Sequence, residues 1–258
     1  MTSGYRRQVI ATFRQPRWLA LAAVTVLMSV LFWWLGTWQW GRWEDRTARN
    51  EAMDAALAAP ATPLSSLVTD PEALPPGAEH RSVTATGRYS ADGQVLQRNP
   101  DGRSGYAILT PLVLDDGGTF LVERGFVPAN PTDATRPAED VTPPAGPVTV
   151  TARLRPPDPA DDRTAPDGQV YAVTPSSIAV GQPAPVYAAY GELVDQLPAP
   201  DPELELPEPP SSGWGPNLFY AIQWWMFIVI AVVGYVVLLR RESSTHHTPA
   251  EPVSTPVE

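Results

Sequence analysis

The residue types that most often carry catalysis or bind metals are scarce in this sequence. Its 258 residues include three histidines and no cysteine, which excludes disulfides, thiolate nucleophiles and cysteine-ligated zinc or iron–sulfur centres. His80 stands at the start of a predicted strand, a position more typical of a surface residue than of a ligand. His246 and His247 lie in a polar tail, where a histidine pair seldom holds a functional metal. These residues predict neither a metal site nor an acid–base pair.

Three short motifs approach known functional patterns without completing them. Residues 102–105 (Gly-Arg-Ser-Gly) lack the second glycine of a nucleophile elbow, because Tyr106 occupies its place. Residues 213–215 (Gly-Trp-Gly) are followed by Pro216 and preceded by no predicted strand, unlike a phosphate-binding loop. The aspartates of residues 158–162 are more typical of a solvated loop than of a cation site. The sequence therefore predicts a protein that is not an enzyme.

Two long apolar stretches divide the chain. Trp18–Trp38 and Leu218–Leu239 contain no charged residue, and about 21 residues at ~1.5 Å rise per residue span roughly 31 Å, the thickness of a hydrocarbon core. The first stretch is too long for a signal peptide, and no small-residue cleavage site follows it. We predict transmembrane helices within residues 18–41 and 211–239, the latter range including the approach to the helix.

The formal charge of −10 is distributed unevenly, and every basic residue is arginine. Residues 1–17 carry four arginines and no acid, and Arg240 and Arg241 directly follow the second span. The positive-inside rule therefore places the N-terminal segment and a disordered tail, residues 240–258, in the cytoplasm. The acidic segment 42–210 is then external, and its charge argues against nucleic-acid binding. The arginine-, proline- and alanine-rich composition suggests a bacterium with a GC-rich genome, and hence its plasma membrane.

The external segment reads as a small β domain with proline-rich linkers. Residues 44–59 predict a helix that continues the first span, and residues 195–213 predict a linker back to the membrane. Turn signals separate short strands over residues 82–89, 94–98, 107–114, 119–127, 148–154 and 170–173, with a helical turn near 176–181. The expected fold is an α+β membrane protein, in which two transmembrane helices flank an external, mainly antiparallel β domain with short helices.

Polar residues mark the outer ends of both spans. Gln39 and Arg42 follow the first span, and Gln223 lies about five residues, roughly 7–8 Å, below the outer end of the second. Tryptophans gather at the same level, as in an interfacial aromatic belt. Two interpretations stay open. Either a Gln39–Gln223 contact holds the spans together, or a polar, tryptophan-lined edge docks another membrane protein or a planar cofactor.

Five motifs, in order along residues 30–240, resemble the Surfeit locus protein 1 family. The motifs are Leu35-Gly36-Thr37-Trp38-Gln39-(x)2-Arg42, Arg81-Ser82-Val83-(x)3-Gly87, Gly105-(x)4-Thr110-Pro111-Leu112, Leu121–Pro128, and Asn217–Ala221 followed by Gln223 and Trp224. The family consists of assembly factors of haem-copper cytochrome c oxidase. The resemblance implies a non-enzymatic role in forming or stabilising the haem a-containing subunit I. The expected partners are subunit I, other oxidase subunits or assembly factors, and the lipid bilayer. The alternative is a stably associated accessory subunit of the oxidase.

Some family members are thought to carry haem a, but Asn217 stands where the family usually has histidine. Asparagine is not an ordinary haem ligand, and although Met226 and Tyr220 are of ligand type, nothing in the sequence favours them. We therefore predict no firmly bound cofactor; haem a would be held transiently, if at all. The expected partner- or haem-proximal residues, none catalytic, are Trp38, Gln39, Arg42, Arg124, Asn217, Tyr220, Gln223 and Trp224. Arg124 is alternatively an ion-pair partner of the domain's acids, and Gly125 is expected to supply an unusual backbone angle.

Overall fold

The protein is described from a computed structural model of the chain. The structure describes residues 10, 12–91, 94–98, 102–133, 142–161, 163–213 and 215–245. The chain forms two compact units, one comprising Met1–Arg49 with Gly213–Glu258 and the other comprising Asn50–Ser212. Trp214, His246 and His247, together with the predicted disordered tail beyond Thr245, lie outside the described residues.

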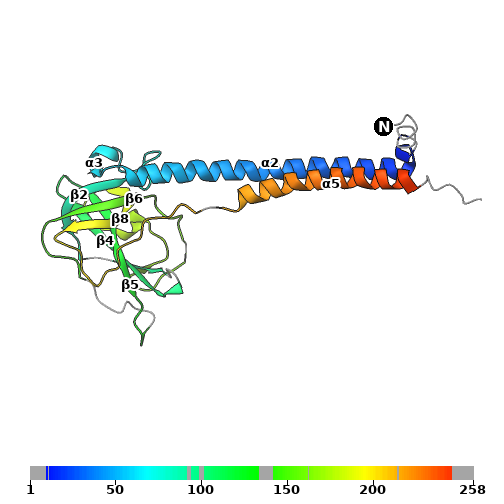
Figure 1. Cartoon of the computed structure of the whole chain (residues 1–258). Coiled ribbons are helices and arrows are strands. Elements are labelled where there is room, and N and C mark those ends of the chain that lie inside the picture. Colours follow the sequence, from blue (N-terminus) through cyan, green and yellow to red (C-terminus); the bar gives the residue numbers. More distant parts are fainter. Residues whose placement is uncertain are drawn as a thin grey trace, which may run out of the picture. The chain divides into compact units, whose positions relative to one another are not determined.

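The first unit is built on two long helices that run side by side (Figure 1). Helix α2 (Pro16–Ala58) begins at a proline, which suits the first turn of a helix, and ends two residues before Pro60. It includes the helical continuation predicted over residues 44–59. Helix α5 (Asn217–Thr245) covers the second predicted span. Both helices are long and apolar enough to cross a membrane, and only 6% of each apolar stretch is buried within the protein.

The second unit is a β domain with two short helices. Its elements are β1 (Thr62–Pro63), α3 (Leu64–Leu67), β2 (Ser82–Tyr89), β3 (Gln94–Arg98), β4 (Gly105–Leu114), β5 (Thr119–Pro128), β6 (Val148–Arg155), β7 (Gln169–Val170), α4 (Pro175–Ile178) and β8 (Val186–Leu197). The strand order is β1-β2-β6-β8-β5-β4-β3-β7, and β2 also pairs with β4. Strands β2, β6, β8, β5 and β4 therefore close into a barrel.

The barrel is mainly antiparallel, as predicted. Around the ring, β5–β8 is parallel, whereas β2–β6, β6–β8, β4–β5 and β2–β4 are antiparallel. Strands β4 and β5 form a hairpin, and its turn contains Gly117 and Gly118 at φ +104° and +85°. Fully buried residues fill one cluster, among them Val83, Leu112, Phe120, Val150 and Leu193. The alternating residues Leu109, Leu121 and Tyr190 pack instead with Ile178 of α4.

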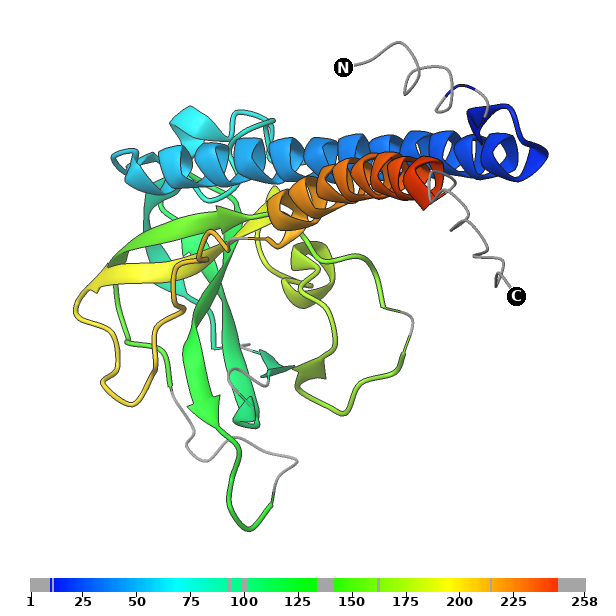
Figure 2. The same cartoon turned by 45° about the vertical axis from the view of Figure 1, so that its right-hand side comes forward.

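Strand β8 was not predicted from the sequence, and it extends to Leu197, so the linker expected from residue 195 begins later. Figure 2 shows this strand in yellow, lying beside β6, with which it pairs. Gly191 interrupts the β-forming residues of the segment and hides it from pattern analysis. In the fold this glycine is required, because a Cβ there would come within 2.7 Å of the Ala152 Cβ and 2.8 Å of the Phe120 ring.

Candidate functional site

Aromatic packing, centred on Trp225, joins the two membrane helices near the end where α5 begins. The Trp225 indole lies on Gly36, where a Cβ would overlap the ring. Its ring centroid is 6.2 Å from that of Trp33 and 5.8 Å from that of Trp40. One turn earlier in α5, Ala221 is fully buried. Small residues opposite large ones let membrane helices approach closely, where packing rather than hydrophobicity drives association.

Trp224, a predicted site residue, also lies at the contact between the helices. Its ring stacks on Phe32 of α2, with centroids 5.6 Å apart and planes inclined by 26°, and it meets Phe227 edge-on at 5.8 Å. Tyr220 precedes Trp224 by four residues, so both project from the same face of α5. Tyr220 is 46% exposed. This face therefore carries one packed and one accessible aromatic side chain.

The two glutamines do not join the spans. Gln223 is exposed and Gln39 is half-buried, and among the described residues no hydrogen bond links their side chains. The interpretation that a Gln39–Gln223 contact holds the helices together was wrong. Gln223 lies two residues from both Ala221 and Trp225, so the helical period turns it away from α2. Gln39 lies seven residues beyond Phe32, on the same stripe of α2.

The exposed edge at this level is aromatic and cationic. Trp38 is 50% exposed, and the Arg42 guanidinium carbon lies 5.8 Å from its ring centroid, one helical turn away. Trp33 and Trp34 are each 61% exposed. Asn217 is the first residue of α5 and is half-buried. The structure therefore places seven of the predicted residues on the helix pair, with Trp38 and Gln223 directed away from its contact.

Arg124 belongs to the other unit and is buried in the barrel. Ile108 pairs with Gly125 and Leu109 with Glu123, so Arg124 is the extra residue of a β-bulge. The bulge directs its guanidinium over the Tyr89 ring at 5.3 Å, and it donates a long 3.5 Å hydrogen bond to the Thr142 carbonyl. Burial lowers the pKa of Arg124, while Tyr89 and Asp201 raise it. Gly125 has the predicted unusual angle, φ +152°.

Tyr89 and Gln196 extend this buried group across the barrel. The Tyr89 hydroxyl donates to Gln196 Oε1 at 2.8 Å, and Gln196 Nε2 donates to the Pro198 carbonyl at 3.0 Å. Burial raises the pKa of Tyr89 well above its ordinary value, against the influence of Arg124. These are satisfied polar groups at the ends of β2 and β8. Buried polar groups that are hydrogen-bonded in this way hold the core in a single arrangement.

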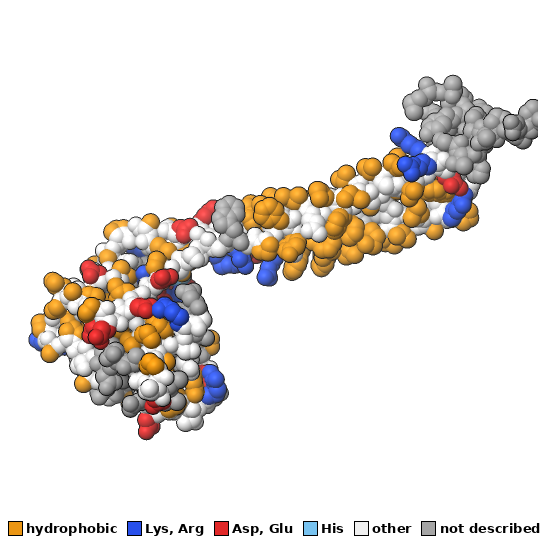
Figure 3. Space-filling view, turned by 60° about the horizontal axis from the view of Figure 1, so that its bottom comes forward, with side chains coloured by type: hydrophobic (Ala, Val, Ile, Leu, Met, Phe, Trp, Pro, Cys, Tyr) orange, Lys and Arg blue, Asp and Glu red, His pale blue; other side chains and the backbone are white. Residues whose placement is uncertain are grey.

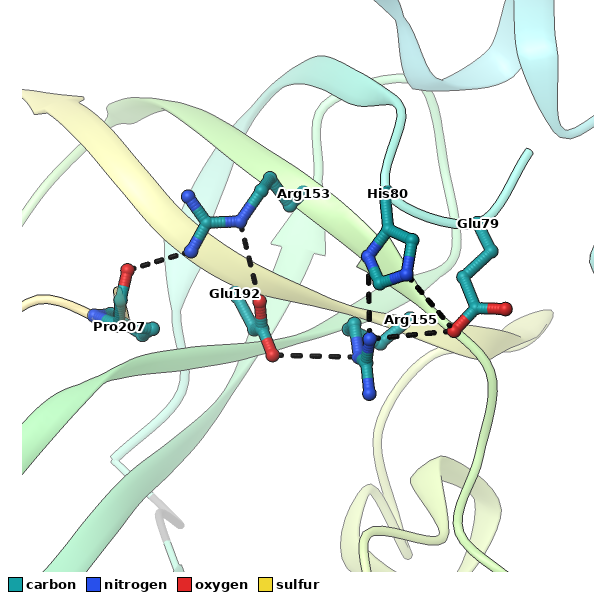
Figure 4. A network of polar contacts seen from close by, with 6 residues as sticks. All are labelled: Glu79, His80, Arg153, Arg155, Glu192 and Pro207. Atoms are coloured by element: carbon teal, nitrogen blue, oxygen red, sulfur yellow. Dashed lines mark hydrogen bonds and ion pairs between the residues drawn. The ribbon is translucent and has the colours of Figure 1, made fainter. Parts of the chain in front are cut away.

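A second polar network ties the loop before β2 to strands β6 and β8 (Figure 4). Arg155 lies 3.4 Å from carboxylate oxygens of both Glu79 and Glu192, and its Nη1 is 3.3 Å from His80 Nδ1. Arg153 contacts Glu192 at 3.3 Å and donates to the Pro207 carbonyl at 2.6 Å. Burial lowers the pKa of His80. His80 is therefore a partner in an ion network, and not the simple surface residue that the sequence suggested.

Sequence reasoning missed the residues at the centre of the helix contact and of the buried polar group in the barrel. Trp225 was read as part of an aromatic belt, and Gly36 as part of a motif, although a glycine within a tryptophan-rich span is itself a signal for close helix contact. Tyr89 and Gln196 gave no sequence signal, because they lie 107 residues apart and meet only when the barrel closes. Among the residues that the structure describes, no three His, Cys, Asp or Glu side chains are grouped to hold a metal.

The chain resembles known proteins over nearly its whole length. The SURF1 family model matches residues 26–229. Uncharacterized SURF1-like proteins of Mycobacterium bovis and Mycobacterium tuberculosis are 32% identical over 260 residues, covering 95% of this chain and 94% of each relative. The cytochrome oxidase assembly protein SHY1 of Saccharomyces cerevisiae is 31% identical over 103 residues, covering 39% of this chain and 26% of the yeast protein. The chain belongs to the SURF1 family, as the Surfeit locus protein 1 motifs indicated.

Proposed function

We propose that this protein is a membrane-bound assembly factor for haem-copper cytochrome c oxidase. It would aid the formation or stabilisation of the haem a-containing subunit I by binding and not by catalysis. The observation that carries the proposal is the similarity, within the SURF1 family, to a yeast protein named for cytochrome oxidase assembly. The mycobacterial relatives favour the plasma membrane of a bacterium, and the terminal arginines favour cytoplasmic termini.

The docking surface in this proposal is the exposed edge of the helix pair. Trp38 and Arg42 supply an accessible indole and guanidinium in contact with each other, and tryptophan and arginine dominate the binding energy of protein interfaces. Gln39 and Tyr220 offer hydrogen-bonding groups on the sides of the two helices. Such groups gain strength in a membrane when a partner helix pairs with them. A hydrophobic oxidase subunit would meet this edge within the bilayer.

The haem of this proposal belongs to subunit I. Helices α2 and α5 contain no histidine, and Asn217 cannot serve as an ordinary iron ligand. Met226 and Tyr220 are 53% and 46% exposed at the helix surface, and neither is among the residues that line the groove between the helices. The side chains of the helix pair therefore fit a protein partner better than a resident haem. No step of the proposed activity passes through a haem bound to this chain.

Deleting the gene and recording cell spectra tests the assembly role. The a-type cytochrome band should fall while b- and c-type bands persist, and the wild-type gene should restore it. An unchanged a-type band would contradict the proposal.

The docking edge is tested by complementing the deletion with Gln39→Ala/Arg42→Ala. We expect the variant to insert normally and to restore much less of the a-type band, whereas Val26→Ala, another change of an exposed residue of α2, should complement fully. Purification of the oxidase in a mild detergent distinguishes this role from the alternative, a resident accessory subunit. Only a resident subunit would accompany active oxidase in stoichiometric amount.

A further inference from the structure

An open apolar groove runs along the two membrane helices and ends at the aromatic contact of Phe32. It has a volume of about 310 Å³, and it lies between α2 and α5 with Thr25, Met28, Phe32, Ala231, Gly234 and Leu238 among its lining residues. Figure 3 shows hydrophobic side chains covering the helix pair between ends that carry charged residues. The groove is a shaped depression in a surface that otherwise faces lipid.

Gly234 at the groove is not required by a close contact between the helices. A Cβ built on Gly36 would overlap Trp225, so that glycine is explained by the helix contact. A Cβ on Gly234 would meet nothing within 4 Å. A glycine within a helix costs about 1 kcal/mol relative to alanine. Its bare backbone instead deepens the groove and leaves room for something that is not part of this chain.

The groove has the length of one bilayer leaflet. Its lining runs on α2 from Leu21 to Phe32, twelve residues whose ends lie roughly 16 Å apart along the helix, which is about half of the ~30 Å hydrocarbon core. Phe32 then closes it, because its ring stacks against Trp224 and lies 5.7 Å from Phe227. A spanning helix would need a contact that continues through both leaflets. A groove of this limited length fits an acyl chain.

The open end of the groove is positively charged. Arg14, Arg17, Arg240 and Arg241 are exposed there, with Glu242 as the one acid of the described residues at this end. Arg17 pairs with Glu242, and the Tyr235 hydroxyl donates to the Trp18 carbonyl at 3.4 Å. These contacts fix the two helix ends beside each other. Each arginine near a membrane surface attracts anionic headgroups.

We propose that the α2–α5 groove binds an acidic glycerophospholipid of the surrounding bilayer. One acyl chain lies along Thr25, Met28 and Gly234 as far as Phe32, and the phosphate faces the arginines at the helix ends. The cationic end and the leaflet-length apolar groove select this ligand together. The site is separate from the Trp38–Arg42 edge of the proposed function and does not rest on it.

Native mass spectrometry of the purified, delipidated full chain tests this proposal. Phosphatidylglycerol and phosphatidylcholine with identical acyl chains are the probes, and inorganic phosphate tests whether the headgroup alone suffices. We expect one phosphatidylglycerol to bind about tenfold more tightly than phosphatidylcholine, with no retention of phosphate. Equal binding of the two lipids, or retention of phosphate alone, would overturn the proposal.

Two variants test separately the binding of the acyl chain in the groove and the binding of the headgroup at the arginines. Gly234→Leu fills the groove and should lower phosphatidylglycerol affinity about tenfold, whereas Val233→Leu, at an exposed neighbour outside the lining, should not change it. Arg14→Gln/Arg17→Gln should remove the preference for phosphatidylglycerol over phosphatidylcholine. If Gly234→Leu leaves lipid affinity unchanged but abolishes self-association or capture of an oxidase subunit, the groove is a protein interface and the lipid proposal is wrong.

Discussion

Gly36 of α2 and Trp225 of α5 are in direct contact, with the indole occupying the space that a side chain at residue 36 would need. The same indole meets Trp33 and Trp40. One residue pair therefore sets how closely the two spans approach. The nine tryptophans of the chain all lie in the unit that contains these spans, so tryptophan fluorescence reports on the helix pair and not on the barrel.

Enlarging Gly36 should loosen the helix pair. Gly36→Ala forces the Trp225 ring to move, and overpacking of this kind costs about 1–3 kcal/mol. We expect a lower melting temperature by tryptophan fluorescence in detergent. Gly41→Ala, in the same helix but with open space around the new Cβ, is the control and should be neutral or slightly stabilising. Equal melting temperatures for all three proteins would show that the contact is not limiting.

Removing the Tyr89 hydroxyl should weaken the barrel. Tyr89→Phe leaves Gln196 Oε1 without its 2.8 Å donor in a buried site, which costs about 1–3 kcal/mol. Urea unfolding followed by the circular-dichroism signal of the sheet should show a lower midpoint. Tyr171→Phe is the matched control, because the Tyr171 hydroxyl donates no hydrogen bond among the described residues and its ring faces Arg163 in a loop. The hydroxyl is dispensable if both variants unfold alike.

Adding a methyl group at Gly125 should detach a neighbouring segment. A Cβ there would lie 2.8 Å from the Glu205 carbonyl oxygen, beside the Phe126–Glu205 bridge. Gly125→Ala should therefore speed hydrogen exchange at the Phe126 amide, which donates to Glu205. Gly168→Ala also has positive φ, +74°, but meets nothing within 4 Å. This control therefore has the backbone strain without the clash. If both variants changed hydrogen exchange at the Phe126 amide equally, the clash with Glu205 would not be the cause.

Mild acid should destabilise the barrel through His80. Burial lowers the pKa of His80 in the fold, an effect to which Arg155 and Arg153 add and which Glu79 and Glu192 oppose. The unfolded chain therefore binds this proton more readily, and stability is lost as the pH falls through the unfolded pKa of about 6.5. His80→Asn tolerates the observed φ of +65° and cannot titrate.

The urea midpoint of the sheet signal should accordingly fall more in the wild type than in His80→Asn between about pH 7.5 and pH 5.5. The two proteins should differ little in this pH dependence above pH 7.5. Parallel curves over the whole range would mean that His80 keeps its ordinary pKa in the fold.

Local sequence signals predicted much of this fold. Residues 82–89 and 94–98 form strands with the predicted bounds, because alternation and flanking turns specify each strand by itself. The helical continuation of the first span beyond Gly41 followed from helix formers uninterrupted by proline. Strand β8 was not predicted, because the reason for its Gly191 is not local. A side chain there would clash with Phe120 and Ala152, which lie far away in the chain.

The candidate site was harder to predict, because its geometry depends on which face of α2 packs against which face of α5. Sequence alone gave the depth of Gln39 and Gln223 but not their rotation about the helix axes. The indole of Trp225 and the ring of Trp224 take the space between the helices, and Gln223 is turned outward. Arg124 was identified, yet its burial depends on a bulge and on Tyr89, which lies 35 residues earlier in the sequence.

The position of β8 has a consequence for how the domain forms during synthesis. It is the last strand in the chain, yet it pairs with both β5 and β6. Until residues 186–197 emerge, those two strands have unpaired edges, which are prone to associate with other chains. Closure must also bring together segments far apart in sequence, which slows folding. Only 19 residues separate the end of β8 from the start of α5, so the barrel completes its ring when the second span is about to follow.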